Sequence, residues 1–120
     1  MKKSINIISK FKLFSDYWSP RVIAELNNYQ IKLVKIKGNF IWHQHKETDE
    51  LFLVIEGSMG IQFKDGTVFL NEGEIFVVKK SREHKPFATE ECKVMIIEPK
   101  GVINTGEKKC DSTFKNDLWV

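Results

Sequence analysis

The sequence predicts an all-β protein, an antiparallel sandwich or barrel that forms one domain. Its 120 residues can close one apolar core but are few for two. From Tyr29 onward, short segments rich in Ile, Val, Phe and Thr alternate with turn-forming residues. Strands this short and this regularly spaced are typical of antiparallel sandwiches and barrels rather than of alternating β and α units.

Residues 1–28 differ from the rest and are expected to form an N-terminal segment with one short helix. Ser19 can cap a helix, and Pro20 suits the first helical position. Val22, Ile23 and Leu26 would then share one helical face, and the two asparagines that follow would end the helix. We expect this helix to pack on the outside of the main body.

The barrel itself is predicted over residues 29–100. Its expected strands are 29–37, 40–45, 50–56, 59–64, 67–70, 74–79, 84–88 and 92–98. Asp65-Gly66 is the best hairpin signal, because a two-residue type I′ turn needs positive φ at both positions. The run IKLVKIK changes its alternation phase at Leu33-Val34, which predicts either a bulge or a strand covered on both faces.

Residues 101–120 are expected to form an irregular C-terminal tail. They include two glycines and several charged residues. Phe114, Leu118 and Trp119 are its large apolar side chains, and we expect them to pack onto the barrel or onto a partner.

The composition excludes several classes of protein. A net charge of +3, from lysines scattered among nearly as many acids, does not predict a nucleic-acid-binding protein. The apolar run at 51–55 is too short to span a membrane. Lysines interrupt the first apolar patch too early for a signal peptide, so we expect a cytoplasmic protein. Cys92 and Cys110 form no CxxC motif and are expected to be reduced thiols rather than a disulfide or metal ligands.

Two of the three histidines stand in the stretch FIWHQH. Side chains two residues apart in a strand point the same way, so His43 and His45 would share one face, at a spacing that suits chelation of one metal ion. Phe40 and Trp42 would share the opposite face. Their size suggests that this face is covered by the N-terminal segment or by another subunit.

A carboxylate and the third histidine fit the same site. The polar residues 46–49 predict a chain reversal, after which Glu50 would open the next strand and face the same interior. A buried carboxylate there is costly unless it is paired or bound to a metal. His84 follows another strand and a turn, and can return to that interior. For any one histidine alone, a structural or exposed role would be the simpler interpretation.

The first motif resembles that of the cupin family, small antiparallel β-barrels with an internal metal site. It consists here of Gly38, four residues, His43-x-His45, four residues, Glu50, six residues and Gly57. The family pattern has five residues after the leading glycine, so this chain is one residue shorter there.

The second cupin motif is present with its spacing intact but with three replacements. It runs from Gly73 through five residues to Lys79, Ser81 and His84, and ends at Ala88. Lys79, Ser81 and Ala88 stand where the family has Pro, Gly and Asn. These changes affect the turn before His84 more than the set of metal ligands.

The resemblance implies a jelly-roll type cupin β-barrel like that of small single-domain bacterial cupins, many of them similar to mannose-6-phosphate isomerase. It implies the metal ligands His43, His45, Glu50 and His84. This set suits divalent Fe, Mn, Ni, Co or Zn and disfavours calcium, which prefers oxygen ligands. Cupin barrels commonly pair through an outer sheet face, so we also expect a homodimer.

Three functions remain open at this point. The first is a metalloenzyme acting on a small polar or sugar-like molecule, as an isomerase, epimerase or dioxygenase. The second is a non-catalytic module that binds a metal and a small ligand. The third is a barrel without a metal. The sequence offers no strong candidate for a catalytic acid or base beyond the ligands. Glu47 could serve as a base at the mouth of the barrel, but a solvated turn residue is its simpler interpretation. Five phenylalanines are candidates for a pocket: Phe52, Phe63, Phe69, Phe76 and Phe87.

Overall fold

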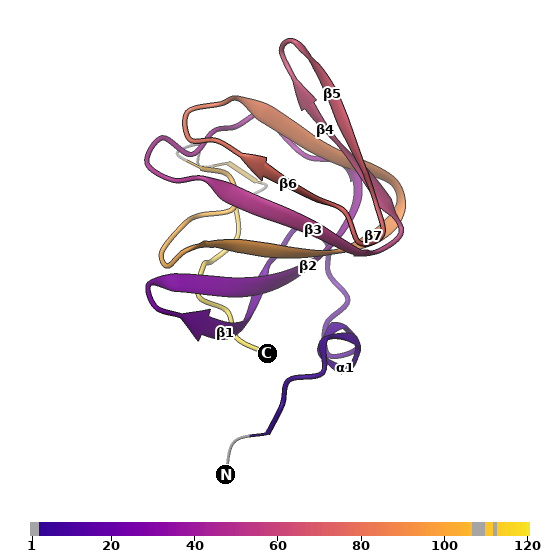
Figure 1. Cartoon of the computed structure of the whole chain (residues 1–120), viewed down its shortest axis with the longest axis vertical. Helices are drawn as coiled ribbons and strands as arrows, with labels where there is room; N and C mark the ends of the chain where they lie inside the picture. Colours follow the sequence, from indigo (N-terminus) through magenta and orange to yellow (C-terminus); the bar gives the residue numbers. More distant parts are fainter. Residues whose placement is uncertain (1–2, 107–109, 112) are drawn as a thin grey trace.

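A computed structural model of the chain describes residues 3–106, 110–111 and 113–120. Within these residues, one short helix precedes seven strands (Figure 1). The elements are α1 (Ile7–Phe11), β1 (Arg21–Leu26), β2 (Tyr29–Asn39), β3 (Glu50–Glu56), β4 (Ser58–Phe63), β5 (Gly66–Asn71), β6 (Ile75–Val78) and β7 (His84–Pro99). The predicted all-β fold with one short helix is confirmed.

The strands form one curved antiparallel sheet in which β7 connects two layers. Five strands pair in the order β1-β2-β7-β3-β6. The first residues of β7 pair instead with β4, which pairs with β5. The layer of β4 and β5 therefore inclines across the first layer, and the two enclose a core between them (Figure 1). This arrangement is an antiparallel barrel of the jelly-roll type.

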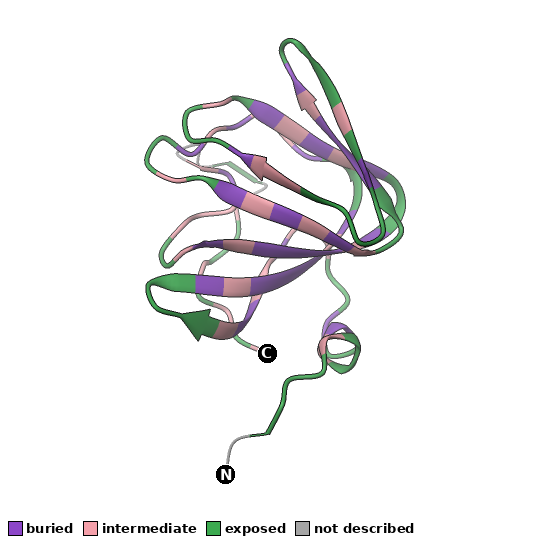
Figure 2. Ribbon diagram, in the orientation of Figure 1, coloured by how far each residue is buried: buried purple, intermediate pink, exposed green. Residues whose placement is uncertain are grey.

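Both faces of the five-strand layer are apolar. The inner face, which includes Val34, Val54 and Val94, belongs to the main core between the layers. The outer face includes Leu33 and Met95, which pack in a second cluster together with Phe11 and Phe14 of the N-terminal segment. Buried and half-buried residues alternate along the strands in Figure 2. Of the two predictions for IKLVKIK, the strand covered on both faces is confirmed at Leu33-Val34.

The helix predicted after Ser19-Pro20 is wrong, because residues 21–26 form strand β1. Val22 and Ile23 are adjacent and are both buried, which in a strand places them on opposite faces. Pairing with β2 satisfies the backbone of the segment and outweighs the local capping signal. The helix lies earlier, at α1, where the side chain of Asn6 accepts a hydrogen bond from the Ser9 amide.

Three predicted strands and the predicted hairpin turn also differ from the structure. Residues 40–45 form no regular strand and are tied to the barrel by one antiparallel bridge, between His43 and His84. The predicted strands 84–88 and 92–98 are one continuous strand, β7. Between β4 and β5 the hairpin exists, but Phe63 pairs with Gly66 and Asp65 does not have positive φ, so the turn is not type I′.

The C-terminal tail packs back onto the barrel. Trp119 forms a parallel bridge with Val22, and the Val22 amide donates to the carbonyl of Leu118. Phe114 is held by a hydrogen bond from its amide to the side chain of Asn104. The tail therefore adds to the β1 edge through backbone bonds, while Phe114 and Trp119 remain 37% and 52% exposed. Cys92 and Cys110 are free thiols, as predicted.

Candidate metal centre

Backbone pairing brings the two histidine-bearing segments together. His43 and His84 exchange both of their backbone hydrogen bonds, at 3.0 and 2.9 Å. Two residues further on, the Ser81 amide donates to the carbonyl of His45 at 2.7 Å. The segment at 40–45 is thus fixed against the start of β7 without forming a regular strand.

Ser81 stands where the cupin pattern has glycine, and its backbone has the conformation that glycine favours. Its φ is 66°, in the left-handed region that side chains other than Asn, Asp and Gly rarely occupy. The Ser81 hydroxyl donates to the carbonyl of Lys46 at 3.3 Å. The turn before His84 therefore keeps the expected shape despite the replacement.

The four residues singled out in the sequence meet inside the barrel. His43, His45, Glu50 and His84 each offer one ligand atom, and these atoms lie within 4.8 Å of one another. All four side chains are buried. Glu50 Oε1 lies 3.5 Å from His45 Nε2 and 3.6 Å from His84 Nε2. Glu50 reaches this position as the first residue of β3, after the chain reversal predicted at 46–49.

The polar atoms at the centre of this cluster form no hydrogen bonds with the described residues. His45 Nε2, His84 Nε2 and Glu50 Oε1 are buried without a hydrogen bond among the residues that the structure describes. The ring nitrogens that face away are held: His43 Nδ1 lies 3.0 Å from the Ile41 carbonyl, and His84 Nδ1 lies 2.8 Å from that of Arg82. Such contacts keep the proton on Nδ1 and direct the Nε2 lone pair inward, as at histidine metal sites.

The electrostatics favour a neutral His43. Burial, and then the proximity of His84, lower the pKa of His43 from 6.5 to about 4. Burial acts to raise the pKa of Glu50, but its contacts with His45 and His84 outweigh burial and lower that pKa well below its usual range. Neutral imidazole and ionised carboxylate are the forms that bind metals. The donor set and its orphaned atoms fit a divalent transition metal.

A cavity adjoins the cluster, with about 40 Å³ available to the centres of water-sized molecules. Most of its wall is apolar, and the exceptions are two glutamates, a histidine and an asparagine. The lining residues are Trp18, Pro20, Val34, Ile36, Phe40, His43, Glu50, Phe52, Met59, Pro86, Val94, Ile96, Glu98 and Asn104. A site of this size suits a small molecule of a few heavy atoms.

The expectation that Phe40 points away from the histidines is wrong. Its ring lies 5.2 Å from that of His43 and stacks on Trp18 at 4.7 Å, between ring centroids. Because residues 40–45 are not a regular strand, side-chain alternation does not hold there. Trp42 instead faces Lys64, whose Nζ lies 4.0 Å from the ring centroid.

The structure also shows where the candidate pocket phenylalanines and Glu47 lie. Of the five phenylalanines, Phe52 lines the cavity, whereas Phe69 is 70% exposed. Glu47 is an exposed residue of the turn, as its simpler interpretation predicted.

Sequence reasoning missed Glu98, a second buried carboxylate of the cavity. Glu98 is 2% exposed, and its Oε2 accepts from Lys32 Nζ at 2.7 Å. Burial, followed by the charge of Glu50, raises the pKa of Glu98 well above its usual range, although Lys32 acts in the opposite direction. The sequence gives no signal for this pair, because the register of β2 against β7 decides which of their faces is the inner one.

Comparison with known proteins identifies the family. The family model described as "Cupin domain" matches residues 32–98. The chain belongs to the cupin family. This cupin is similar to a cupin-2 domain containing protein from Shewanella frigidimarina, at 57% identity over 80% of this chain and 94% of that one, with a TM-score of 0.79.

Two further relatives are more distant. The structure of protein NMB1881 from Neisseria meningitidis is 33% identical over 82% of this chain and 100% of that chain, with a TM-score of 0.75. The uncharacterized protein YdbB of Bacillus subtilis is 36% identical over 64 residues, which are 52% of this cupin and 57% of YdbB. The match thus spans little more than half of that curated relative. In the described part of the chain, no helix is long and apolar enough to cross a membrane.

Proposed function

We propose that this cupin holds one divalent transition metal on His43, His45, Glu50 and His84, and acts on a small polar or sugar-like molecule. The observation that carries the proposal is the convergence of three buried, unpartnered ligand atoms on one point. Buried polar atoms are almost always paired, and three such atoms together need a common partner. A metal ion is a partner that satisfies all of them.

The charge of the site supports a divalent ion. Three neutral imidazoles and one carboxylate give a net charge of about −1 before an ion binds. Imidazole nitrogen suits Fe(II), Mn(II), Ni(II), Co(II) and Zn(II), whereas calcium prefers an all-oxygen set. When bound, such an ion supplies Lewis-acid or redox chemistry at a position that the protein leaves open.

The residues around the cluster would orient a ligand and exclude water. Trp18 and Phe40 stack over one side of the cavity, and Phe52 lines it from β3. Glu98 adds a carboxylate that is not among the four clustered residues. A second carboxylate favours catalysis, of the isomerase, epimerase or dioxygenase type, over simple storage of a metal.

The alternative is a non-catalytic cupin module that binds a metal and a small ligand. The small size of the cavity favours this alternative, since it leaves little room for a sugar-sized molecule beside the cluster. An isotope exchange or oxygen consumption assay on the loaded protein separates the two, because the module would catalyse neither.

Elemental analysis tests the metal assignment. We expect about one equivalent of a transition metal in protein purified without a metal-binding tag, and its loss when His43 and His45 are both changed to Ala. Gln44→Ala, between the two histidines, is the matched control and should keep its metal. Absence of metal from the wild type, even after reconstitution, would overturn the proposal.

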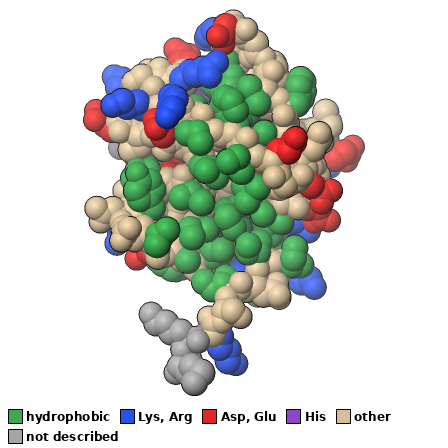
Figure 3. All heavy atoms as spheres, in the orientation of Figure 1, with side chains coloured by type: hydrophobic (Ala, Val, Ile, Leu, Met, Phe, Trp, Pro, Cys, Tyr) green, Lys and Arg blue, Asp and Glu red, His purple; other side chains and the backbone are tan. Residues whose placement is uncertain are grey.

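We also infer that the protein is a homodimer formed through the outer sheet face. Cross-strand pairs place eight apolar side chains on that face: Tyr29, Ile31, Leu51, Leu53, Ile75, Val77, Ile97 and Pro99. Figure 3 shows this apolar surface over the sheet, with charged side chains around its edge. Ile75 is 57% exposed there, and Tyr29 is 48% exposed. A second copy would cover the face with an identical one, as two-fold interfaces do.

The dimer is tested by sedimentation or light scattering. Val77→Glu places a charge within the apolar face and should give a monomer. Thr67→Glu introduces the same side chain at an exposed position of β5 and should leave the dimer intact. A monomeric wild type would contradict the inference.

We propose the cytoplasm as the location, where Cys92 and Cys110 would remain reduced.

A further inference from the structure

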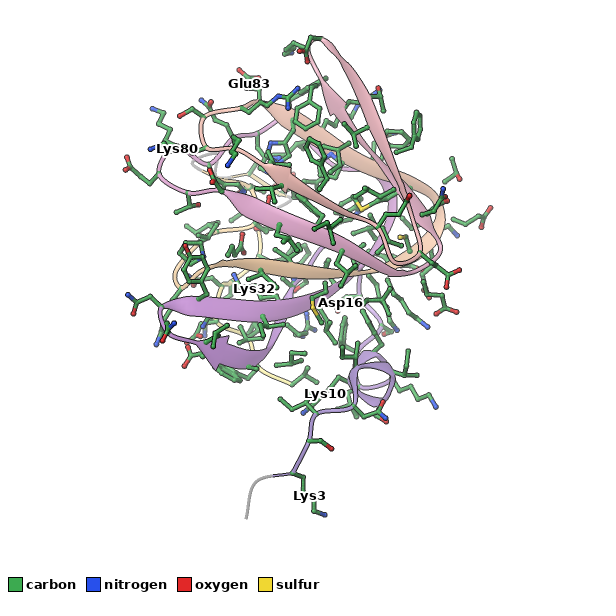
Figure 4. The ribbon with its side chains drawn as sticks, in the orientation of Figure 1. Lys3, Lys10, Asp16, Lys32, Lys80 and Glu83 are labelled. Carbon is green, nitrogen blue, oxygen red and sulfur yellow. The ribbon has the colours of Figure 1, made fainter. Side chains whose placement is uncertain are left out.

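Glu98 lies on the inner face of the barrel, near the end of β7, and is fixed by one strong contact. Its Oε2 accepts from Lys32 Nζ at 2.7 Å, and both side chains are nearly inaccessible, at 3% and 4% exposure. The same ammonium lies 3.4 Å from the carbonyl of Val102 at the start of the tail. Figure 4 shows Lys32 within the body of the molecule, whereas Lys3, Lys80 and Glu83 lie at its periphery.

The other oxygen of Glu98, Oε1, is buried and receives no hydrogen bond from the described residues, although the Glu98 carboxyl interacts with that of Glu50. Glu98 borders the same cavity as His43 and Glu50. It also borders a second, smaller pocket beneath the tail, together with Asn104 and Asn116. A buried carboxylate oxygen without a donor costs free energy, so this position is suited to a donor that arrives with a ligand.

We propose that Glu98 is a ligand-binding residue, whose free oxygen accepts a hydrogen bond from a hydroxyl group of the small molecule that binds at the metal. Lys32 is the positioning residue that holds the carboxylate in place. This inference rests on the proposed function, since it assumes a metal on the four clustered residues.

The proposal narrows the class of ligand. A molecule that reaches both the metal and Glu98 within this small cavity needs an oxygen for the metal and a hydroxyl on a neighbouring carbon. Small α-hydroxy acids, and vicinal diols or hydroxyketones of similar size, have this pattern. With a divalent ion in place the four-ligand cluster carries a charge of about +1, which favours an anionic oxygen on the metal. The α-hydroxy acids therefore fit best.

The test compares two probes that differ by one hydroxyl group. Wild-type protein is loaded with Co(II), and its visible absorption is followed while glycolate or acetate is added. The same titrations use Glu98→Gln, which keeps the size of the side chain, and Glu90→Gln, which makes the same change at an exposed position of β7. Cobalt content is measured for each protein.

We expect the preference for glycolate over acetate to fall about tenfold in Glu98→Gln, because the Gln oxygen would accept from Lys32 and the amide NH2 would replace the oxygen that accepts from the hydroxyl. Glu90→Gln should keep the full preference, and all three proteins should hold one cobalt. If Glu98→Gln does not fold, the paired variant Lys32→Met/Glu98→Met, which replaces the buried ions by apolar groups, serves instead and should show the same loss.

The outcomes separate the two proposals. An unchanged glycolate preference in a variant that still binds cobalt would overturn the role of Glu98 and leave the metal site standing. A wild-type protein that binds no cobalt would overturn both.

Discussion

The two faces of the five-strand layer differ in chemistry although the same strands form them. The inner face carries Glu50, which contacts His84 of the other layer, and the buried pair of Lys32 and Glu98, set among apolar side chains. The outer face is apolar at each of the positions that pair across its centre. At these positions, alternation along the strands buries charged groups within an apolar core and leaves apolar groups at the surface, which inverts the usual order.

The inversion indicates what each face is for. Charged groups are buried at a cost, so their concentration on the inner face marks the functional site. Apolar groups at the surface are stable when something covers them, and α1 with the residues after it covers part of the outer face through Phe11 and Phe14. The uncovered part is the surface that we assign to a second copy.

The largest effect expected on the inner face is that of Lys32→Met. This change leaves Glu98 buried without its cation, and we expect it to lower the free energy of unfolding by about 4 kcal/mol. The double variant Lys32→Met/Glu98→Met should recover most of that loss. Urea denaturation measures both. A Lys32→Met variant as stable as the wild type would show that the inner face does not depend on this pair.

The next effect concerns the covered part of the outer face. Phe11 is 1% exposed, and Phe11→Ala should lower the free energy of unfolding by about 3 kcal/mol, through lost burial and a residual cavity. Ile75→Ala is the control on the open part of the same face, and should cost less than about 1 kcal/mol in dilute protein, since Ile75 is 57% exposed. Equal losses of stability in the two variants would mean that α1 does not cover this part of the outer face.

Metal binding at the inner face should stabilise the folded protein by slightly less than Phe11→Ala destabilises it. At a free zinc concentration a hundredfold above its dissociation constant, the free energy of unfolding should rise by about 2.7 kcal/mol. Thermal or chemical denaturation with and without zinc measures the rise. The variant with His43 and His45 changed to Ala should show none, and an equal rise in that variant would place the ion elsewhere.

The smallest effect is a difference in reactivity between two thiols. Cys92 lies in the inner core at 0% exposure, and burial raises its pKa to about 11, whereas Cys110 is exposed. A thiol reagent should modify one cysteine rapidly and the second after denaturation, because the thiolate is the reacting form. Cys110→Ser is the control that should remove the fast phase. Rapid modification of both cysteines in the folded protein would contradict the burial of Cys92 in the core.

The cluster of four candidate ligands could be anticipated because its signal is local. The spacing of His43, His45 and Glu50, followed by His84 after a turn, depends on one chain reversal and one return of the chain. Both can be inferred from polar and turn-forming residues. The cupin membership and the antiparallel fold follow from the same motifs and from the regular strands after Tyr29.

The errors have a common physical cause, which is that long-range pairing overrides local pattern. Ser19-Pro20 is a sound helix start, yet β1 forms there because β2 offers it a partner. The stretch at Phe40 alternates like a strand, but its backbone bonds to His84 and Pro86 at one edge without regular pairing, and Phe40 turns into the cavity.

Glu98 and Lys32 could not be found from composition or motif. A lysine or glutamate that alternates with apolar residues is normally solvent-exposed, and the sequence does not say which face of a two-sided apolar strand is inside. The pair can be recognised once the register of the sheet is known. Lys32 of β2 lies opposite Ile96 of β7, and Glu98 is two residues after Ile96 on the same face of β7.

The central claim is that three histidines and one glutamate bind a single metal ion inside the barrel. X-ray absorption spectroscopy of protein loaded with one equivalent of zinc tests it most directly. We expect three imidazole nitrogens and one carboxylate oxygen at about 2.0–2.2 Å, with open positions filled by water or ligand. A first shell with sulfur, or with fewer than two imidazoles, would contradict the assignment of His43, His45, Glu50 and His84.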